Sequence, residues 1–461
     1  MHLGIGAFHR AHQAVFTEDA VAAAGGDWGI CGVTQRGPGV VEQLAPQDGL
    51  YTVATRDGER ERLRVVGAVR ELLWARADPE GLLNRIAAPT TRIITLTVTE
   101  KGYRHDPASG RLRRDDPDVA ADAADGGTRT VIGQLTAGLD RRRRRGGPPV
   151  TVVSCDNLPA NGRLLAGLVG ELAGTYSGGD ALRSWIEESV GFPSTMVDRI
   201  VPATTAADRD RIGAVLGVAD AGAVVTEPFA QWVIEDAFAG PRPAWERAGA
   251  ILTDDAGPYE QIKLRLLNGT HSTIAYLGAL AGYEFIADAV RADGPFAPAL
   301  RALMAQDAAP TLAAADGVDL DRYQDAVLHR FGNVALRHRT LQVAADGSQK
   351  LPQRLLATAL ERRRAGAEPG MVALAVAGWM RFVSARRSDT GDELPLDDPL
   401  AETLAQRVGH RTAPADVVDR LLDLDVIFSP ELADDRVWRD LLVERLAMLS
   451  RDGAAATARR L

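Results

Sequence analysis

The sequence predicts an α/β unit of the Rossmann type with a mostly parallel sheet, followed by an all-helical unit. Up to about residue 255, short β-branched runs alternate with amphipathic helical stretches, which is typical of a parallel sheet. A Gly-x-Gly turn near the start separates a short apolar run from a helical stretch. After Gly257 the β-branched runs nearly vanish and Ala/Leu-rich amphipathic stretches take over. We therefore expect a dinucleotide-binding domain at 1–255 and a helical substrate and catalytic domain at 256–461.

The composition excludes several classes of protein. Of the 461 residues, 46% are hydrophobic and 25% charged, and the net charge is −9, so we expect no nucleic-acid partner. No run of about 18 apolar residues occurs, so we expect no membrane span. Cys31 and Cys155 lie in apolar runs, which predicts buried thiols in a reducing, cytoplasmic compartment. The histidines are scattered and the cysteines form no cluster, so no metal site is expected. The basic run 141–145 is expected to be the solvated end of a helix over 130–144.

The first motif is a strand, a glycine turn and a helix that runs through Ala24. This order suits a dinucleotide whose pyrophosphate rests on a helix N-terminus. The residues expected to bind the dinucleotide here are Gly4, Ile5, Gly6, Ala7 and Phe8. The third glycine of the usual fingerprint is absent and the first strand is short, so a plain glycine turn is the alternative.

The second strand, expected over 28–35, ends without an acidic residue. An Asp or Glu at this place usually binds the ribose hydroxyls of NAD. Here Gln35-Arg36-Gly37 follows, and Arg36 could accommodate the 2′-phosphate of NADP instead. We expect NAD as the coenzyme, with NADP as the alternative.

Two buried strands, expected over 92–98 and 149–155, end in polar residues. Thr99 and Glu100 follow the first, and Asn157 follows the second. Open α/β sheets bind ligands at the carboxyl ends of parallel strands. The alternatives are a plain loop after the first strand and a helix cap, formed by Asp156 or Asn157, after the second.

Other elements of the first half are assigned from the same patterns. A strand over 192–202 carries Asp198, for which an ion pair with Arg199 is the alternative to a functional role. Two short strands, 50–54 and 63–69, flank the turn Asp57-Gly58. A helix is expected over 79–87, and the helical stretches of the second half are 259–281, 296–314, 319–344, 351–365, 369–387, 398–408, 414–425 and 435–458.

The helix over 259–278 carries four polar groups that can exchange or donate protons. At roughly 100° per residue, Glu260, Lys263, Asn268 and His271 fall within one arc of about 140° on an α-helix. Burial of a charged lysine is costly, so the pKa of Lys263 should fall, which would make it a usable general acid/base. Alternatively, Lys263 extends to solvent and the other three are satisfied core polar groups.

These parts together suit hydride transfer to a ketone. Such a reaction needs a bound nicotinamide, a proton donor for the developing alkoxide, and polarising hydrogen bonds to that oxygen. Lys263 can supply the proton, and Asn157 and Asn268 can supply the hydrogen bonds. The helix opens the second domain, and domain junctions are common ligand sites.

The sequence also resembles the polyol-specific long-chain dehydrogenase family, which includes mannitol 2-dehydrogenase and fructuronate reductase. The resemblance rests on GxGAFHRAHQ at 4–13, TEKGY at 99–103, SCDNLPANG at 154–162, TMVDRIVP at 195–202, EPFAQWVIED at 227–236 and K-x4-N-x2-H at 263–271. It implies a zinc-independent oxidoreductase, active as a monomer. It implies Lys263 as general acid/base, Asn157 and Asn268 at the reacting oxygen, and His271 as an orienting group. Glu260 would relay protons toward Lys263, and Asp198 and Lys350 would contact the substrate chain.

The substrate is expected to be a small sugar acid or polyol. The stretch 336–355 and the TEKGY motif resemble the fructuronate reductase branch, and mannitol enzymes tend to have an arginine where Gln342 stands. A uronate carboxylate would pair with a basic residue, for which the candidates are Arg337, Arg339, Lys350 and Arg354. Surface salt bridges are the alternative for each. We expect interconversion of D-fructuronate and D-mannonate; mannitol-to-fructose oxidation, tagaturonate reduction and a non-catalytic nucleotide-binding regulator are the alternatives.

Overall fold

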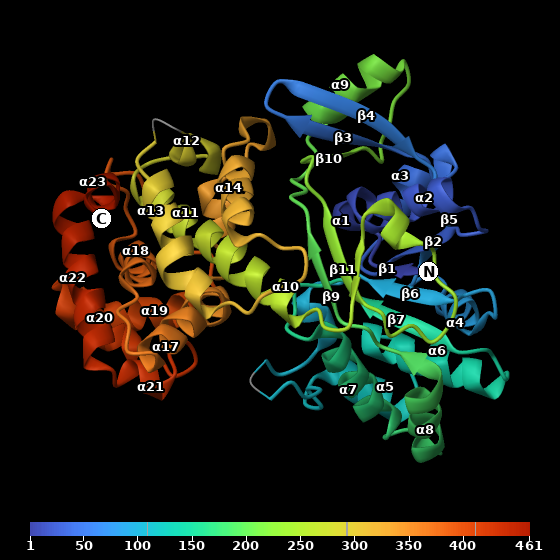
Figure 1. Cartoon of the computed structure of the whole chain (residues 1–461). Helices are drawn as coiled ribbons and strands as arrows, with labels where there is room; N and C mark the ends of the chain where they lie inside the picture. The colour runs from blue at the N-terminus through green and yellow to red at the C-terminus, as the bar shows by residue number, and fades with distance from the viewer. Residues whose placement is uncertain (108, 292–293, 411) are drawn as a thin grey trace. The chain divides into compact units, whose positions relative to one another are not determined.

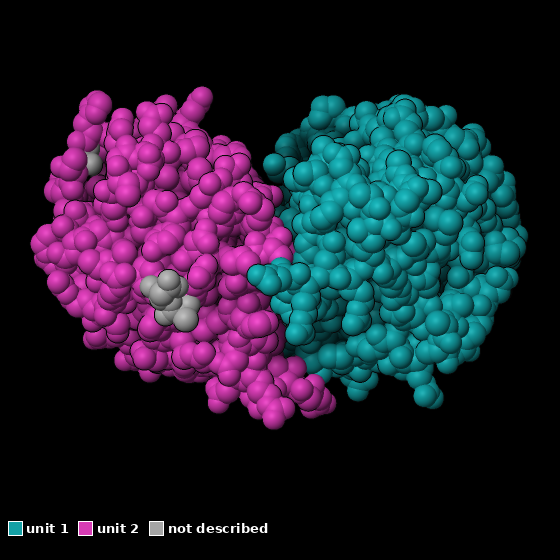
Figure 2. All heavy atoms as spheres, turned by 90° about the horizontal axis from the view of Figure 1, so that it is seen from above, with its two compact units in different colours: residues 1–260 teal, residues 261–461 magenta. Residues whose placement is uncertain are grey.

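The computed structural model describes residues 1–107, 109–291, 294–410 and 412–461. The chain forms two compact units, residues 1–260 and 261–461 (Figure 2). The first is a Rossmann-type unit with a parallel sheet and the second is helix-rich, so the predicted fold class is confirmed. The division falls inside helix α10, Gly257–Ile262.

The first unit is built on a six-stranded sheet in which every neighbouring pair is parallel. Its order is β5-β2-β1-β6-β7-β8 (Figure 1). The strands are β1 (His2–Leu3), β2 (Ile30–Thr34), β5 (Val69–Trp74), β6 (Ile93–Leu96), β7 (Val150–Ser154) and β8 (Val190–Gly191). The strand order reverses at β1, and the carboxyl ends beside such a switch point are where open α/β sheets bind ligands.

Strand residues alternate between the two faces of this sheet, so each face has its own apolar core. Ile94 and Val152 pack with Leu135 of the helical layer on one side (Figure 1). That layer consists of α4 (Pro79–Ala87), α6 (Val131–Arg144), α7 (Asn161–Ala173) and α8 (Gly179–Ser189). Ile93 and Val153 point to the other face, which is covered partly by α2 (Gln13–Ala24).

Two small sheets complete the first unit, in the orders β10-β3-β4 and β12-β11-β9. Their strands are β3 (Tyr51–Asp57), β4 (Arg60–Val66), β9 (Thr195–Asp198), β10 (Val224–Thr226), β11 (Gln231–Glu235) and β12 (Ile251–Thr253). The predicted hairpin around Asp57-Gly58 is present, but its second strand was extended too far. The backbone N–H of Gly67 leaves the ladder to bind the carboxylate of Glu18, and Val69 starts β5 of the main sheet. The remaining helices are α1 (Ala7–Ala11), α3 (Gly39–Leu44), α5 (Pro117–Asp125) and α9 (Ala206–Leu216).

The prediction that the basic side chains of residues 141–145 are solvated is wrong for Arg142. This side chain is fully buried and donates hydrogen bonds to the carbonyl oxygens of Ile86, Ala88, Thr91 and Pro148. Burial lowers its pKa to about 10. Arg142 therefore ties α6 to the segment that leads into β6, a contact with residues more than fifty positions away.

The second unit packs around α18 (Gly370–Ala385) and α11 (Gly269–Leu280), which contact each other. Its other α-helices are α12 (Ile286–Val290), α13 (Ala297–Ala302), α14 (Leu320–Phe331), α15 (Thr340–Ala344), α16 (Gly347–Leu351), α17 (Ala357–Arg364), α19 (Ala401–Val408), α20 (Pro414–Leu422), α21 (Pro430–Ala433), α22 (Arg436–Asp452) and α23 (Ala454–Arg460). The single helix expected over 319–344 is wrong, because the chain leaves α14 at Gly332 and Arg339 forms a β-bridge with Phe285. Among the residues that the structure describes, no helix is both long enough and apolar enough to cross a membrane.

Among the described residues of this unit, three helices contain π-helical turns, at Lys263–Asn268 (η4), Leu303–Ala308 (η5) and Pro352–Leu356 (η8). The first of these segments contacts both of the others. The regular α-helix expected over 259–278 is therefore wrong at its centre. A π-turn closes its hydrogen bonds one residue later than an α-turn and is frequent at functional sites.

Candidate active site

A cavity of about 520 Å³ opens at the carboxyl ends of β1, β2 and β6, beside the switch point of the sheet. The glycine turn, the segment after β2 and the segment after β6 all line it. Five of the predicted coenzyme residues are among its lining residues, namely Gly4, Ile5, Gly6, Arg36 and Thr99. Ala7, Phe8 and Glu100 are not among them.

The backbone at Gly4 adopts a conformation that only glycine adopts without strain. Its φ is +96°, and a Cβ atom there would lie 2.2 Å from the carbonyl oxygen of Thr97. The carbonyl oxygen of Gly4 accepts a hydrogen bond from Thr97 Oγ1 at 2.9 Å, and its N–H donates to Val33 at 2.8 Å. The turn is thus held against the ends of β2 and β6, and its bare backbone leaves room for a dinucleotide to approach closely.

Two stacked histidines support this turn, and neither was among the predicted site residues. The rings of His2 and His9 lie 3.4 Å apart. His2 contacts Thr95 Oγ1 at 2.7 Å and Thr97 Oγ1 at 2.8 Å. Burial lowers the pKa of both histidines, that of His2 to about 3. Neither ring nitrogen of His9 has a hydrogen-bond partner within the described ranges. Two histidines in an otherwise apolar opening segment were the signal in the sequence.

The carboxylate of Asp156 organises the segment after β6. It accepts hydrogen bonds from the backbone N–H groups of Val98 and Thr99, both at 2.9 Å, and from Tyr103 Oη at 2.8 Å. Thr99 has a φ of +66°, a conformation that such a residue keeps only when its surroundings enforce it. Burial raises the pKa of Asp156. The alternative role for Asp156 as a cap of α7 is therefore wrong, because the residue at that N-cap is Ala160, without a side-chain cap.

Asn157 and Glu260 are connected through the loop after β7. Asn157 is exposed in this loop. At its end, the backbone N–H of Ala160 donates to Oε2 of Glu260 at 3.1 Å. Asn161 anchors the loop by donating to the carbonyl oxygens of Asp156 and Thr195 at 3.0 and 2.9 Å.

Asp198 is buried at the end of β9, where it pairs with Gln231 of β11. The guanidinium of the next residue, Arg199, donates to the backbone carbonyl oxygens of Ala11 and Glu227. Burial lowers the pKa of Arg199 to about 10. Arg199 thus connects α1, β9 and the segment before β11.

In the second unit, Lys263 and Asn268 are the first and last residues of the π-helical segment η4. Lys263 is buried, with 7% of its surface exposed, and Asn268 is half-buried. The predicted α-helical arc does not hold here, because the π-turn adds a residue to the turn. Residues five apart, such as these two, thereby return toward the same side of the helix.

His271 lies in the first turn of α11 within a strongly basic environment. Its ring stacks on Phe331, with centroids 4.8 Å apart, and meets the ring of His338 edge-on at the same separation. Its pKa lies well below the ordinary value, first because of burial and then because of the nearby charges of His338, Arg354, Arg330 and Lys350. His271 is therefore neutral near pH 7. Its Nε2 is buried and has no hydrogen-bond partner among the residues described.

The basic residues predicted as candidates for binding a substrate carboxylate separate into two groups, those near His271 and those at the surface. Arg354 and Lys350 belong to the environment of His271; Arg354 also donates to Ser272 Oγ at 3.1 Å. Arg339 is exposed and pairs with Glu284 at 2.5 Å, which fits the surface salt bridge given as its alternative. Arg337 lies over the ring of Phe285, 4.8 Å from its centroid.

Arg330 was not among the site residues predicted from the sequence. It is buried in α14 and contributes to the positive field at His271. Its signal was its spacing, since it lies three residues after Val327 and beside Phe331 on the apolar face of the helix. Gln342, where an arginine would be expected in a mannitol enzyme, is exposed in α15.

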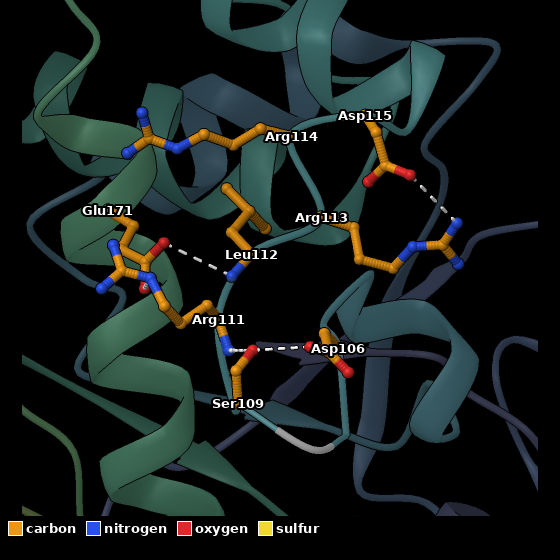
Figure 3. Close-up of a pocket in the computed structure, with 8 residues that line it drawn as sticks. All are labelled: Asp106, Ser109, Arg111, Leu112, Arg113, Arg114, Asp115 and Glu171. Carbon is orange, nitrogen blue, oxygen red and sulfur yellow. Dashed lines mark hydrogen bonds and ion pairs between the residues drawn. The ribbon is translucent and has the colours of Figure 1, made fainter. Parts of the chain in front are cut away.

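A second hollow, of about 560 Å³, contains none of the predicted site residues (Figure 3). It lies beside residues 104–107 and 109–116, and Arg111 pairs there with Glu171 and Arg113 with Asp115. Glu171 accepts from the N–H of Leu112, and Ser109 donates to Asp106 at 2.7 Å. Within the described part of the chain, no group of three or more His, Cys, Asp or Glu side chains could hold a metal ion.

Comparison with known families assigns both units. Residues 1–247 match the mannitol dehydrogenase Rossmann domain, and residues 255–448 match the mannitol dehydrogenase C-terminal domain. The chain belongs to the mannitol dehydrogenase family. Members of this family are similar to it over nearly its whole length.

One such relative is the D-mannonate oxidoreductase of Escherichia coli, which is 44% identical over 94% of this chain and 89% of its own length. An uncharacterised E. coli oxidoreductase, YdfI, is 43% identical over 99% of this chain and 94% of its own. Among solved structures, Pseudomonas fluorescens mannitol 2-dehydrogenase in complex with NAD and D-mannitol is 36% identical, with a TM-score of 0.88 over 100% of this chain and 93% of that one.

Proposed function

We propose that this protein is an NAD-dependent oxidoreductase that interconverts D-fructuronate and D-mannonate by hydride transfer. The observation that carries this proposal is the basic environment of His271, whose pKa is lowered and whose Nε2 is buried. The 44% identity to a D-mannonate oxidoreductase supports it.

The cavity at the ends of β1, β2 and β6 suits the coenzyme. NAD supplies a nicotinamide ring that accepts or gives up the hydride. Gly4 presents bare backbone to the cavity, where a side chain would collide with Thr97. Asp156 fixes the N–H groups of Val98 and Thr99 at the end of β6. These features support the proposal that a dinucleotide binds in this cavity.

Lys263 is the proposed proton donor to the developing alkoxide. It is buried at the start of the π-turn, next along the chain to the turn that carries Glu260. Asn157 and Asn268 are proposed to donate hydrogen bonds to the reacting oxygen. Glu260 is proposed to pass protons toward Lys263, and Asp198 to bind substrate hydroxyl groups.

The second unit favours an anionic substrate. Neutral His271 can exchange hydrogen bonds with hydroxyl groups, while Arg330, Lys350 and Arg354 create a positive field around it. A carboxylate is stabilised by such a field, and guanidinium groups bind it in a bidentate geometry. A sugar acid therefore fits these side chains better than a neutral polyol.

Mannitol oxidation is the second candidate, supported by the likeness to the P. fluorescens enzyme over the whole chain. The basic side chains around His271 favour the sugar acid over mannitol, because mannitol carries no charge. A non-catalytic regulator has no need for a buried lysine beside an asparagine and a histidine, which weighs against that alternative.

The proposal is tested by adding D-fructuronate and NADH to the full chain and identifying the product. We expect consumption of NADH and formation of D-mannonate. Lys263→Met and Lys263→Arg should each lower kcat by about 100-fold or more, because neither side chain releases a proton near neutral pH. NADH binding, measured by fluorescence, should persist in both variants. Absence of turnover in the unaltered chain, or full activity of Lys263→Met, would contradict the proposal.

A further inference from the structure

Two arginines line the coenzyme cavity just after the carboxyl ends of β2 and β5. These strands are neighbouring and parallel, and Thr34 is paired with Trp74 at their carboxyl ends. Arg36 and Arg76 each follow two residues later, in the segments that leave these strands. Both side chains line the cavity and both are exposed.

These two arginines differ from the other arginines of the cavity because no carboxylate pairs with them in the described part of the chain. Arg104 is paired with Asp116 and Asp118, and Arg129 with Asp122 and Asp125. Neither Arg36 nor Arg76 has an ion pair or side-chain hydrogen bond within the ranges that the structure describes. No Asp or Glu is among the described residues that line the cavity. A concentrated positive charge therefore faces this end of the groove.

Gln35, the residue before Arg36, is uncharged. Gln35 stands where an NAD-binding fold commonly has an acid that binds the ribose hydroxyls and repels a 2′-phosphate. Its side chain is engaged in two reciprocal hydrogen bonds with Gln134, at 3.0 and 2.9 Å. The end of β2 thus presents no negative charge to a phosphate on the ribose.

We propose that Arg36 and Arg76 bind the 2′-phosphate of NADP(H), so that the protein accepts NADPH as well as NADH. The inference rests on the proposed function in one respect, that a dinucleotide occupies this cavity. A guanidinium group matches the geometry of a phosphate and pairs with it through two hydrogen bonds. Two such groups, on the segments that follow adjacent strands, supply enough positive charge and donors for one phosphate.

The test compares two small nucleotides that differ in the 2′-phosphate, 2′,5′-ADP and 5′-AMP. Their affinities for the full chain are measured by titration calorimetry at low ionic strength. We expect 2′,5′-ADP to bind at least about tenfold more tightly than 5′-AMP. Arg36→Ala and Arg76→Ala should each remove most of this advantage and leave the affinity for 5′-AMP nearly unchanged.

Arg70→Ala is the matched control, because Arg70 is an exposed arginine of β5 that does not line the cavity. It should keep the full preference for 2′,5′-ADP. Equal binding of the two nucleotides, or an equal loss in Arg70→Ala, would overturn the inference and leave the proposed function intact. Binding of neither nucleotide would overturn the inference and the assignment of the cavity together. Turnover of D-fructuronate with NADH tests the proposed function separately.

Discussion

The backbone N–H of Ala160 donates a hydrogen bond to Oε2 of Glu260, at 3.1 Å. Ala160 immediately precedes α7 and has a φ of +46°. The carboxylate therefore sits at the N-terminus of a thirteen-residue helix, where a negative charge is favoured. One oxygen of Glu260 thus fixes the loop that carries Asn157, and we propose that the same carboxylate takes part in the proton relay.

Substitution of Glu260 separates these two roles. Glu260→Gln keeps an oxygen that accepts from Ala160 but cannot carry a proton, so kcat should fall about tenfold or more with little change in stability. Glu260→Ala should lower kcat and also cost about 1 kcal/mol of unfolding free energy. Steady-state kinetics and urea unfolding measure the two effects. Ala160→Gly keeps the N–H and suits a positive φ, so it should retain activity; full activity of Glu260→Gln would contradict the relay.

Gly4 and Gly37 form a second matched pair, since both line the coenzyme cavity. A Cβ at Gly4 would collide with the backbone of Thr97 at a positive φ, whereas nothing lies within 4 Å of a Cβ at Gly37. Gly4→Ala should lower the unfolding free energy by about 2 kcal/mol or more and weaken 5′-AMP binding. Gly37→Ala should change stability by less than about 0.5 kcal/mol. Urea unfolding and calorimetry measure both, and an unaffected Gly4→Ala would disprove the role of the turn.

Arg354 and Arg339 test the recognition of a carboxylate. Arg354 contributes to the field around His271, while Arg339 pairs with Glu284 at the surface. Arg354→Met should raise KM for D-fructuronate about tenfold and change KM for D-fructose much less, because only the uronate is charged. Arg339→Met should leave both values near those of the unaltered chain. A similar loss for both substrates would show that Arg354 supports the fold rather than the carboxylate.

The buried histidines predict a loss of stability in acid. The pKa values of His9 and His271 are lowered by burial, so the unfolded chain binds protons that the folded chain refuses. The stability they contribute is present above the ordinary histidine pKa of about 6.5 and is lost as pH falls below it. Each should lower the unfolding free energy by up to about 1.4 kcal/mol per pH unit. His271→Asn should flatten this fall between pH 7 and 5, measured by urea unfolding, and His410→Asn, at an exposed site, should not.

Much of the first unit could be predicted because its signals are local. The strands of the parallel sheet are β-branched runs, and α4 begins at Pro79 and ends at Ala87 as its apolar spacing indicates. The role of Asp156 could not be predicted. Its partners Val98 and Thr99 lie nearly sixty residues away, and a carboxylate just before a helix equally favours a cap.

The π-turn at Lys263 could not be predicted from the sequence, for a different reason. Periodicity of apolar residues does not distinguish one extra residue in a single turn, and η4 is packed against two other π-turns from distant segments. The same limit applies to Arg142 and Arg330, whose burial depends on tertiary packing. The roles proposed for Lys263, Asn157 and Asn268 stay predictions that the variants above address.

The most direct test of the central claim is the specificity constant kcat/KM for reduction of D-fructuronate relative to D-fructose, with D-tagaturonate alongside and NADH as the donor. The positive field around His271 predicts a preference for D-fructuronate over D-fructose of at least about tenfold, or about 1.4 kcal/mol of transition-state stabilisation. An equal or greater kcat/KM for D-fructose would contradict recognition of a sugar acid and would assign the protein to mannitol oxidation.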